Sequence, residues 1–163
     1  MRPQYNYKGE SVVGVKRKLL KPEYGTGKED EYGIPLVKWG YFLTAEADNE
    51  GFDTEHEESN KKHTIEITLP KGTVILRYGD ENGRYTAPKG TAYEELALPY
   101  VPETMEYNEY EVIADGLTVQ CIVTKGKVAM SIEGTGGGVQ YKHNEPITRL
   151  IRKGALERLK LWA

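Results

Sequence analysis

The 163-residue sequence lacks the features that mark several protein classes. Cys121 is its single cysteine, so an internal disulfide and a thiolate metal cluster are both excluded. Its 22 basic and 25 acidic residues give a net charge of −3, whereas general nucleic-acid and membrane-surface binders carry a basic excess. No segment approaches the length of a membrane span, and the opening residues MRPQYNYKGES lack the apolar run of a signal peptide. We therefore expect a soluble domain that binds neither nucleic acid nor membrane.

Phenylalanine is scarce as well, with 2 residues against 12 tyrosines, whereas the 18 glycines exceed average usage. Tyrosine and glycine together are typical of β-structure with many turns. Apolar and polar residues alternate in four segments, which predicts short strands at residues 64–69, 73–78, 117–123 and 127–132. Residues 124–127, TKGK, would form a hairpin turn between the last two strands, and residues 36–44 predict one more strand.

One helix is predicted near the C-terminus. Pro146 suits a first turn and Gly154 is well placed to end the helix, with an apolar face between them formed by Ile147, Leu150 and Ile151. Residues 155–163, ALERLKLWA, fit either a short second helix or a closing strand. The predicted fold class is therefore α+β, a mainly antiparallel β core of short strands with a C-terminal helix.

Composition divides the chain into two parts. Residues 1–63 are a loosely organised lead-in with many turn signals, and residues 45–62 within it are charged and poor in apolar residues, which predicts an exposed, mobile acidic loop. Residues 16–18, KRK, are the only compact basic run, and we interpret them as a solvated face. We expect residues 64–163 to form the core, with the whole chain making one compact domain.

Two segments are unusual. In residues 133–141, EGTGGGVQY, ordered glycines cost backbone entropy, so either the loop is flexible or something comes very close to its backbone. In residues 76–88, LRYGDENGRYTAP, Asn82-Gly83 is a strong turn signal between apolar runs. A hairpin there would gather two arginines and two tyrosines, namely Arg77, Tyr78, Arg84 and Tyr85. By itself this is the pattern of an ordinary hairpin that carries cations.

Taken together, the segments resemble the TNT family, the domain of the tuberculosis necrotizing toxin. The resemblance runs over roughly residues 67–158 in consistent order, from LPKGTVILRYGDENGRYTAPKGT through ALPY, YNEYEV and GTGGGVQY to ITRLIRKGAL. It implies a toxin domain that hydrolyses NAD+, and NADP+ as well, to nicotinamide and ADP-ribose. It also implies that NAD+ is a substrate, with no cofactor and no metal required.

The resemblance implies roles for single residues too. Arg77 matches the arginine that holds the dinucleotide, Tyr85 its aromatic partner and Gln140 the glutamine at the reacting ribose. Asn108 stands where relatives commonly carry a histidine, and we expect it to complete the catalytic set with Arg77 and Gln140. The other residues expected to bind substrate are Tyr78, Arg84, Gly137, Gly138 and Tyr141. On this reading the glycines let their loop wrap closely round the substrate.

The sequence departs from the family pattern at Leu96 and Asn108. Leu96 replaces an arginine ahead of the leucine-proline pair, which removes a phosphate contact, and Asn108 keeps hydrogen bonding but cannot titrate. Two alternatives therefore stay open. An ADP-ribosyltransferase would share the substrate but usually relies on a carboxylate near the ribose, which the glycine loop does not offer. A catalytically silent NAD-binding or interaction module would keep the fold alone.

The resemblance implies a setting for the protein as well. We expect a secreted or delivered effector that acts in the target-cell cytoplasm, with a cognate immunity protein as partner. Other candidate residues are interpreted as structural. The histidines are too scattered for a metal site and read as surface or loop residues, Cys121 as a buried small hydrophobe, and Trp39 and Trp162 as packing residues. The three histidines are His56, His63 and His143.

Overall fold

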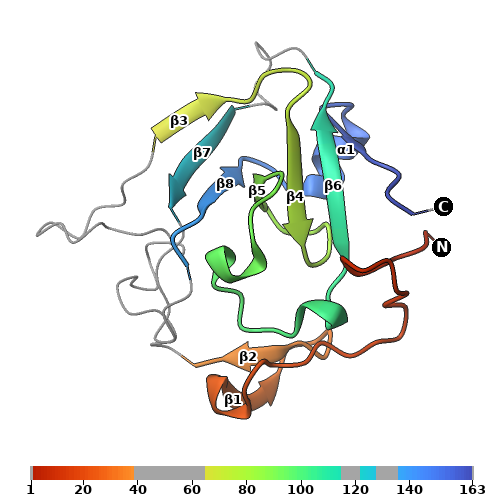
Figure 1. The fold of residues 1–163 in the computed structure, drawn as a ribbon, viewed down its shortest axis with the longest axis vertical. Helices are drawn as coiled ribbons and strands as arrows, with labels where there is room; N and C mark the ends of the chain where they lie inside the picture. Colours follow the sequence, from red (N-terminus) through yellow and green to blue (C-terminus); the bar gives the residue numbers. More distant parts are fainter. Residues whose placement is uncertain (1, 39–64, 115–121, 128–135, 163) are drawn as a thin grey trace, which may run out of the picture.

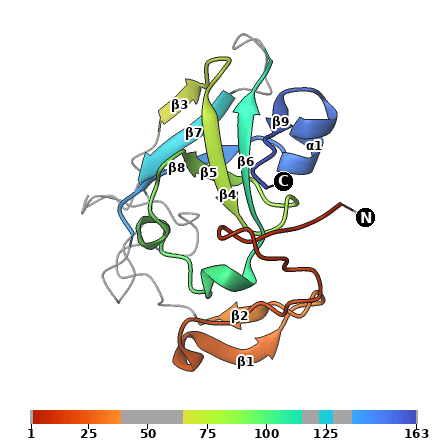
Figure 2. The same cartoon turned by 45° about the vertical axis from the view of Figure 1, so that its right-hand side comes forward.

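A computed structural model of the chain describes residues 2–38, 65–114, 122–127 and 136–162. Within these ranges the fold is built round a 7-stranded antiparallel sheet in the order β3-β7-β8-β5-β4-β6-β9 (Figures 1 and 2; β9 is labelled in Figure 2). Its strands span Ile65–Thr68 (β3), Ile122–Lys127 (β7), Val139–His143 (β8), Tyr85–Pro88 (β5), Val74–Tyr78 (β4), Tyr107–Val112 (β6) and Leu156–Arg158 (β9). The predicted α+β class with a mainly antiparallel β core is confirmed.

The helix α1 (Ile147–Arg152) follows β8 and lies where the sequence predicts it (Figure 2). Pro146 is its N-cap, and Gly154 follows its last turn with a φ of +80°, a left-handed conformation that glycine adopts without steric cost. The chain then returns to the sheet as β9. Residues 155–163 therefore contain a closing strand, which was one of the two predicted possibilities. Within the described ranges no helix is long and apolar enough to cross a membrane.

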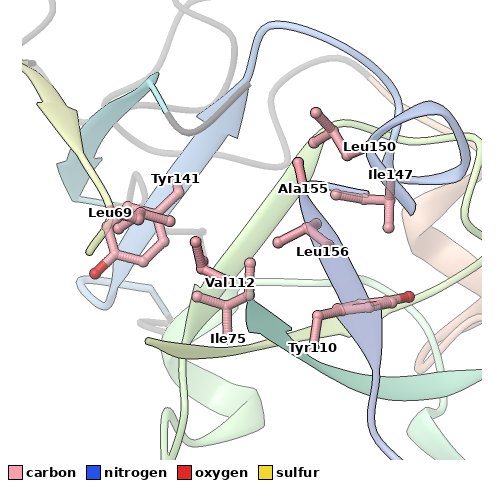
Figure 3. Packing of buried hydrophobic residues seen from close by; sticks show 9 residues of the cluster. All are labelled: Leu69, Ile75, Tyr110, Val112, Tyr141, Ile147, Leu150, Ala155 and Leu156. Atoms are coloured by element: carbon pink, nitrogen blue, oxygen red, sulfur yellow. The ribbon is translucent and has the colours of Figure 1, made fainter. Parts of the chain in front are cut away.

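The hydrophobic core lies between α1 and one face of the sheet (Figure 3). Ile75 of β4, Tyr110 of β6 and Ile147 of α1 are each 0% exposed. The cluster consists of Leu69, Ile75, Tyr110, Val112, Tyr141, Ile147, Leu150, Ala155 and Leu156. Because successive strand residues point to opposite faces, burial of Ile75 in this core turns Leu76 and Tyr78 to the other face of the sheet.

The N-terminal part forms a second, 2-stranded sheet of β1 (Gly25–Glu29) and β2 (Pro35–Val37), preceded by the 3-10 helix η1 (Pro22–Tyr24). This sheet lies at the end of the molecule away from β3 and α1 in both views (Figures 1 and 2). Between β5 and β6 the chain forms two further 3-10 helices, η3 (Tyr93–Leu96) and η4 (Pro102–Thr104). The N-terminal segment pairs with the stretch between η3 and η4 through an antiparallel bridge from Leu19 to Tyr100.

Residues 124–127 do not form the predicted hairpin turn. They lie inside β7, which pairs with β3 on one edge and with β8 on the other. Thr124 and Lys125 pair with both neighbours, and Gly126 and Lys127 pair with β8 alone; this pairing keeps the backbone extended and outweighs the local turn signal. Other predictions concern residues outside the described ranges: strand residues 39–44, 117–121 and 128–132, the acidic loop at 45–62, and the side chains of Trp39, His56, His63 and Cys121.

Candidate functional site

A cleft of about 420 Å³ opens beside the ends of β4, β5 and β8. Its opposite wall is the segment from Leu96 to Tyr100, which joins η3 to η4. A smaller pocket of about 60 Å³ adjoins the cleft and reaches further along β4 and β5. The two share the lining residues Arg77, Tyr78, Tyr85, Leu96, Leu98 and Gln140. Arg77, Tyr78, Tyr85 and Gln140, all expected from the sequence, are therefore brought together.

Strand register explains why three of these side chains meet. Tyr85 pairs with Lys142 of β8, so it shares a face of the sheet with Gln140, two residues earlier in that strand. Leu76 of β4 pairs with the residue two after Tyr85, which places Leu76 and Tyr78 on the same face as Tyr85. This is the face turned away from the core, so the three polar side chains line the cleft without opening the hydrophobic cluster.

Arg77 starts from the other face and reaches the cleft beneath the turn between β4 and β5. Its Nε donates to the Asp80 carbonyl at 2.6 Å and its Nη1 to the Tyr85 carbonyl at 2.9 Å. Burial lowers the pKa of the guanidinium, an effect that the Asp80 charge opposes. No ion pair holds Arg77 within the described ranges. The cleft thus contains a half-buried positive charge, which suits an anionic ligand.

Tyr78 is fixed in place by other aromatic rings. Its ring centroid lies 4.7 Å from that of Tyr93 in an edge-to-face arrangement and 4.8 Å from that of Tyr107 in a tilted one. Burial, reinforced by nearby acidic groups, raises the pKa of Tyr78 to about 12, so its hydroxyl stays protonated at neutral pH. Tyr78 therefore offers the cleft a rigid, neutral aromatic surface on which a ring can stack.

Arg17 also lines the cleft, which contradicts the predicted solvated face for this residue. It is half-buried, and its guanidinium carbon lies 4.8 Å from the ring centroid of Tyr100. Lys16 and Lys18 beside it are exposed, as expected. Local sequence gives no signal for the difference, because the bridge between residues 19 and 100 joins segments far apart in the chain.

The described glycines of the loop before β8 pack against η3. The Gly136 N–H donates to the Glu94 carbonyl at 2.9 Å and the Gly138 N–H to the Glu95 carbonyl at 3.0 Å. A Cβ atom on Gly138 would lie 2.8 Å from Cβ of Glu95, closer than real carbon atoms pack. What comes close to the loop backbone is therefore η3, and neither Gly137 nor Gly138 is among the residues that line the cleft. Gly134 lies outside the described residues.

Three other predicted site residues lie away from the cleft. Asn108 pairs with Arg77 in the sheet and points to the face opposite Tyr78, where it lines a separate cavity of about 380 Å³ and donates to Glu106 Oε2 at 2.5 Å. Tyr141 is 8% exposed and belongs to the hydrophobic core. Arg84 is exposed and donates to the Asn144 carbonyl at 2.8 Å. Strand parity and register separate Asn108 and Tyr141 from Gln140, whereas Arg84 lies just before β5 begins.

His143 is not the surface or loop residue that the sequence analysis expects. It ends β8, is 2% exposed, and its Nε2 lies 2.7 Å from the Thr86 hydroxyl oxygen. Burial lowers the pKa of His143 to about 4, helped by the positive charge of Arg77, so the ring is neutral at physiological pH. The sequence did hold a signal for this burial, because residues two apart in a strand share a face and His143 lies two residues after Tyr141. Trp162 packs on Gly9, in agreement with the packing role expected for it.

The chemistry available in the cleft comes from cations, tyrosines and an amide. Asp80 is the carboxylate among the described lining residues, and its Oδ1 accepts the backbone N–H of Asn82 at 2.9 Å. No group of three or more acidic, histidine or cysteine side chains forms a metal site in the part of the chain that the structure describes. The arrangement can hold an anion and an aromatic ring and can orient a polar group beside Gln140.

Fold and cleft together define a small α+β domain with a cleft lined by arginines, tyrosines and an amide at the ends of its central strands. The family model described as Tuberculosis necrotizing toxin matches residues 68–159, more than half of the chain. The protein belongs to this family. The matched range contains Arg77, Tyr78, Tyr85 and Gln140, whereas Arg17 precedes it.

Individual relatives extend the comparison. The chain is 28% identical over 139 residues to the conidial surface nicotinamide adenine dinucleotide glycohydrolase nadA of Aspergillus fumigatus, a match that covers 80% of this chain and 55% of that protein. It thus spans about half the length of this curated relative. The solved structure of tuberculosis necrotizing toxin complexed with its immunity factor has the same fold, with a TM-score of 0.50 at 20% identity over 90% of this chain and 81% of that one. Tse6 in complex with Tsi6 gives a TM-score of 0.45 at 17% identity, covering 68% and 77% of the two chains.

Proposed function

We propose that this domain is an NAD+ glycohydrolase that hydrolyses NAD+, and NADP+ as a second substrate, to nicotinamide and ADP-ribose. The observation that carries the proposal is the convergence of Arg77, Tyr85 and Gln140 on one cleft, inside the range matched by the toxin family. The similarity to a nicotinamide adenine dinucleotide glycohydrolase supports the same substrate.

The chemistry suits such a site. Nicotinamide leaves NAD+ as a neutral group from a cationic ring, so the bond breaks through an oxocarbenium-like state with little need for a general acid. Arg77 binds the negatively charged pyrophosphate, and Tyr78 or Tyr85 stacks on a ring of the substrate. The Gln140 amide accepts from a ribose hydroxyl and orients the attacking water. Positioning and electrostatics of this kind can supply most of the rate enhancement.

Hydrolysis is favoured over ADP-ribosyl transfer because of the carboxylate position. A transferase usually relies on a carboxylate at the reacting ribose, whereas Asp80, the carboxylate among the described lining residues, lies exposed in the turn after β4 and accepts from the backbone there. The departures at Leu96 and Asn108 were the reasons to consider a silent module. Asn108 lies outside the cleft, so its identity does not argue against catalysis.

The direct test is to incubate the purified protein with NAD+ and to quantify free nicotinamide and ADP-ribose by chromatography. We expect equal amounts of the two products, and Gln140→Ala should lower turnover by about a hundredfold or more, as is typical for loss of a positioned polar group. Gln4→Ala is the matched control, since Gln4 is outside the cleft. Nicotinamide released without free ADP-ribose, in the presence of a labelled acceptor protein, would instead identify a transferase. If no nicotinamide is released at all, the catalytically silent NAD-binding module is the remaining interpretation.

We further propose that the protein is a delivered effector acting in the cytoplasm of a target cell, and that a cognate immunity protein covers the cleft. The solved toxin with the same fold is complexed with an immunity factor. The cleft is open, so a producing cell would need such a partner to protect its own NAD+. Expression of the protein in the cytoplasm should stop growth, and co-expression with the product of the neighbouring reading frame should restore it. Harmless expression of an enzyme that is active in vitro would contradict this view.

A further inference from the structure

We propose that Arg17 is a second phosphate-binding residue of the cleft, which acts beside Arg77 and supplies from the N-terminal segment the cation that Leu96 does not provide. The inference rests on the proposed function, because it assigns the pyrophosphate of NAD+ as the ligand of both arginines. It names a residue that lies outside the range matched by the toxin family.

Arg17 faces the cleft with its charge available. Its guanidinium carbon lies over the Tyr100 ring, 4.8 Å from the ring centroid, and the side chain lines the same cavity as Arg77 and Gln140. Within the described ranges it takes part in no ion pair, whereas the neighbouring Lys16 reaches Glu29 with its Nζ at 3.8 Å. A cation–π contact does not use up the N–H donors of a guanidinium, so Arg17 can still donate to an oxyanion.

The backbone around Arg17 is fixed rather than free to swing. The Leu20 N–H donates to the Pro99 carbonyl at 2.8 Å, and the Val101 N–H donates to the Lys18 carbonyl at 2.8 Å. The Lys18 N–H also donates to the Thr104 hydroxyl at 3.2 Å. The cleft wall that carries Tyr100 is thus bonded to the segment that carries Arg17, which holds the two side chains near each other.

Two cations suit this ligand better than one. A pyrophosphate linkage carries two negative charges, and arginine meets phosphate oxygens with two parallel hydrogen bonds. Arg77 already donates from its Nε and Nη1 to carbonyl oxygens, which leaves it fewer N–H groups for the phosphate oxygens. Leu96 lines the cleft but offers no donor. Electrostatics agree with the pairing, because the positive charge of Arg17 contributes to the lowered pKa of Arg77.

The experiment measures ADP-ribose affinity by calorimetry and the KM for NAD+ in four proteins: wild type, Arg17→Ala, Arg17→Lys and Arg17→Ala with Leu96→Arg. We expect Arg17→Ala to weaken ADP-ribose binding and to raise KM by about tenfold, with kcat within about twofold. Arg17→Lys should fall between wild type and alanine, since lysine keeps the charge but not the fork. Leu96→Arg should restore part of the lost affinity. Lys16→Ala and Lys18→Ala remove the same charge from neighbouring positions and should bind like wild type.

The outcomes separate this inference from the proposed function. NAD+ cleavage with unchanged affinity in Arg17→Ala would overturn the role of Arg17 and leave the enzyme intact. An equal loss of ADP-ribose affinity in Lys16→Ala would show that any nearby positive charge has the same effect, and would also overturn the specific role of Arg17. ADP-ribose binding that depends on Arg17 in a protein that releases no nicotinamide would refute the glycohydrolase and support the phosphate site. Melting curves monitored by circular dichroism check that every variant is folded, and Arg17→Lys provides the milder substitution if alanine unfolds the chain.

Discussion

Gly83 lies directly against the guanidinium of Arg77, so that a Cβ atom on the glycine would overlap Nη2 of the arginine. The turn that holds Gly83 is anchored to α1, since the N–H of Ile147 donates to the Gly83 carbonyl at 3.0 Å and the N–H of Thr148 to the Glu81 carbonyl at 2.9 Å. Because this backbone is tied down, a side chain at position 83 would have to displace the arginine.

Gly83→Ala should therefore act through Arg77. We expect the guanidinium to give up its bonds to the Asp80 and Tyr85 carbonyls, at a cost of about 1–3 kcal/mol in the free energy of unfolding. ADP-ribose affinity should fall as well, since a displaced guanidinium no longer meets the pyrophosphate. In an Arg77→Ala background the same substitution should cost no more than about 0.5 kcal/mol, since the obstacle is gone. Urea unfolding of the four proteins of this cycle measures the coupling. Equal costs in both backgrounds would contradict the proposed steric mechanism.

Asn108→Ala should change stability rather than catalysis. The side chain donates to Glu106 at 2.5 Å on the face opposite the cleft, and loss of that bond should lower the free energy of unfolding by about 1 kcal/mol. Turnover per folded molecule should remain that of wild type, and Asn108→His should introduce no pH dependence near neutrality. Initial rates and melting temperatures measured on the same samples decide the matter. A loss of turnover comparable to that of Gln140→Ala would return Asn108 to the catalytic set.

Glu81 should make the protein sensitive to strong acid. This carboxylate is 5% exposed and accepts from Arg158, Tyr110 and Arg2. Burial acts to raise the pKa of Glu81, but the hydrogen bonds from Arg158 and Tyr110 outweigh it and hold the pKa below the ordinary 4.5. Its stabilisation is therefore complete above about pH 4.5 and is lost as the pH falls through the lowered folded-state value.

Glu81→Gln tests this assignment. The variant should be about 2 kcal/mol less stable at pH 7, because hydrogen bonds to a charged group are lost, and it should show a smaller further loss below pH 4.5. Glu66→Gln is the matched control, since Glu66 lies exposed on β3. Urea unfolding across the pH range measures both effects. A variant that keeps the acid sensitivity of wild type would show that another group causes it.

His143 should make a separate contribution at milder acidity. With a pKa lowered from 6.5 to about 4 in the folded state, His143 stays neutral while the unfolded chain takes up a proton, so stability falls as the pH drops from about 6.5 to 4, by about 3 kcal/mol in total. Nuclear magnetic resonance of the ring protons should show no titration of His143 above pH 5. His143→Gln should flatten the dependence of the melting temperature on pH in that window. A native midpoint near 6.5 would refute the buried, neutral assignment.

The sequence by itself determined the local features of this protein. These features depend on contacts between near neighbours, so they can be recognised from the sequence directly. They are the alternating residues at 64–69 and 73–78, the turn at Asn82-Gly83, and the apolar helix face between Pro146 and Gly154. The resemblance in the ordered motifs located Arg77, Tyr85 and Gln140, and the family match confirms membership in the toxin family. The roles of these residues in catalysis stay predictions.

Only the tertiary structure decided what depends on pairing between distant segments. Arg17 enters the cleft because its segment bonds to residues 99–101, whereas Asn108 leaves the cleft because its register opposite Arg77 fixes the face it occupies. TKGK stays extended since β8 pairs along its whole length and β3 pairs with its first two residues. His143 is buried because β8 places it on the face of Tyr141. A one-residue change in strand register would reverse each exposed and buried face, and local sequence does not set that register.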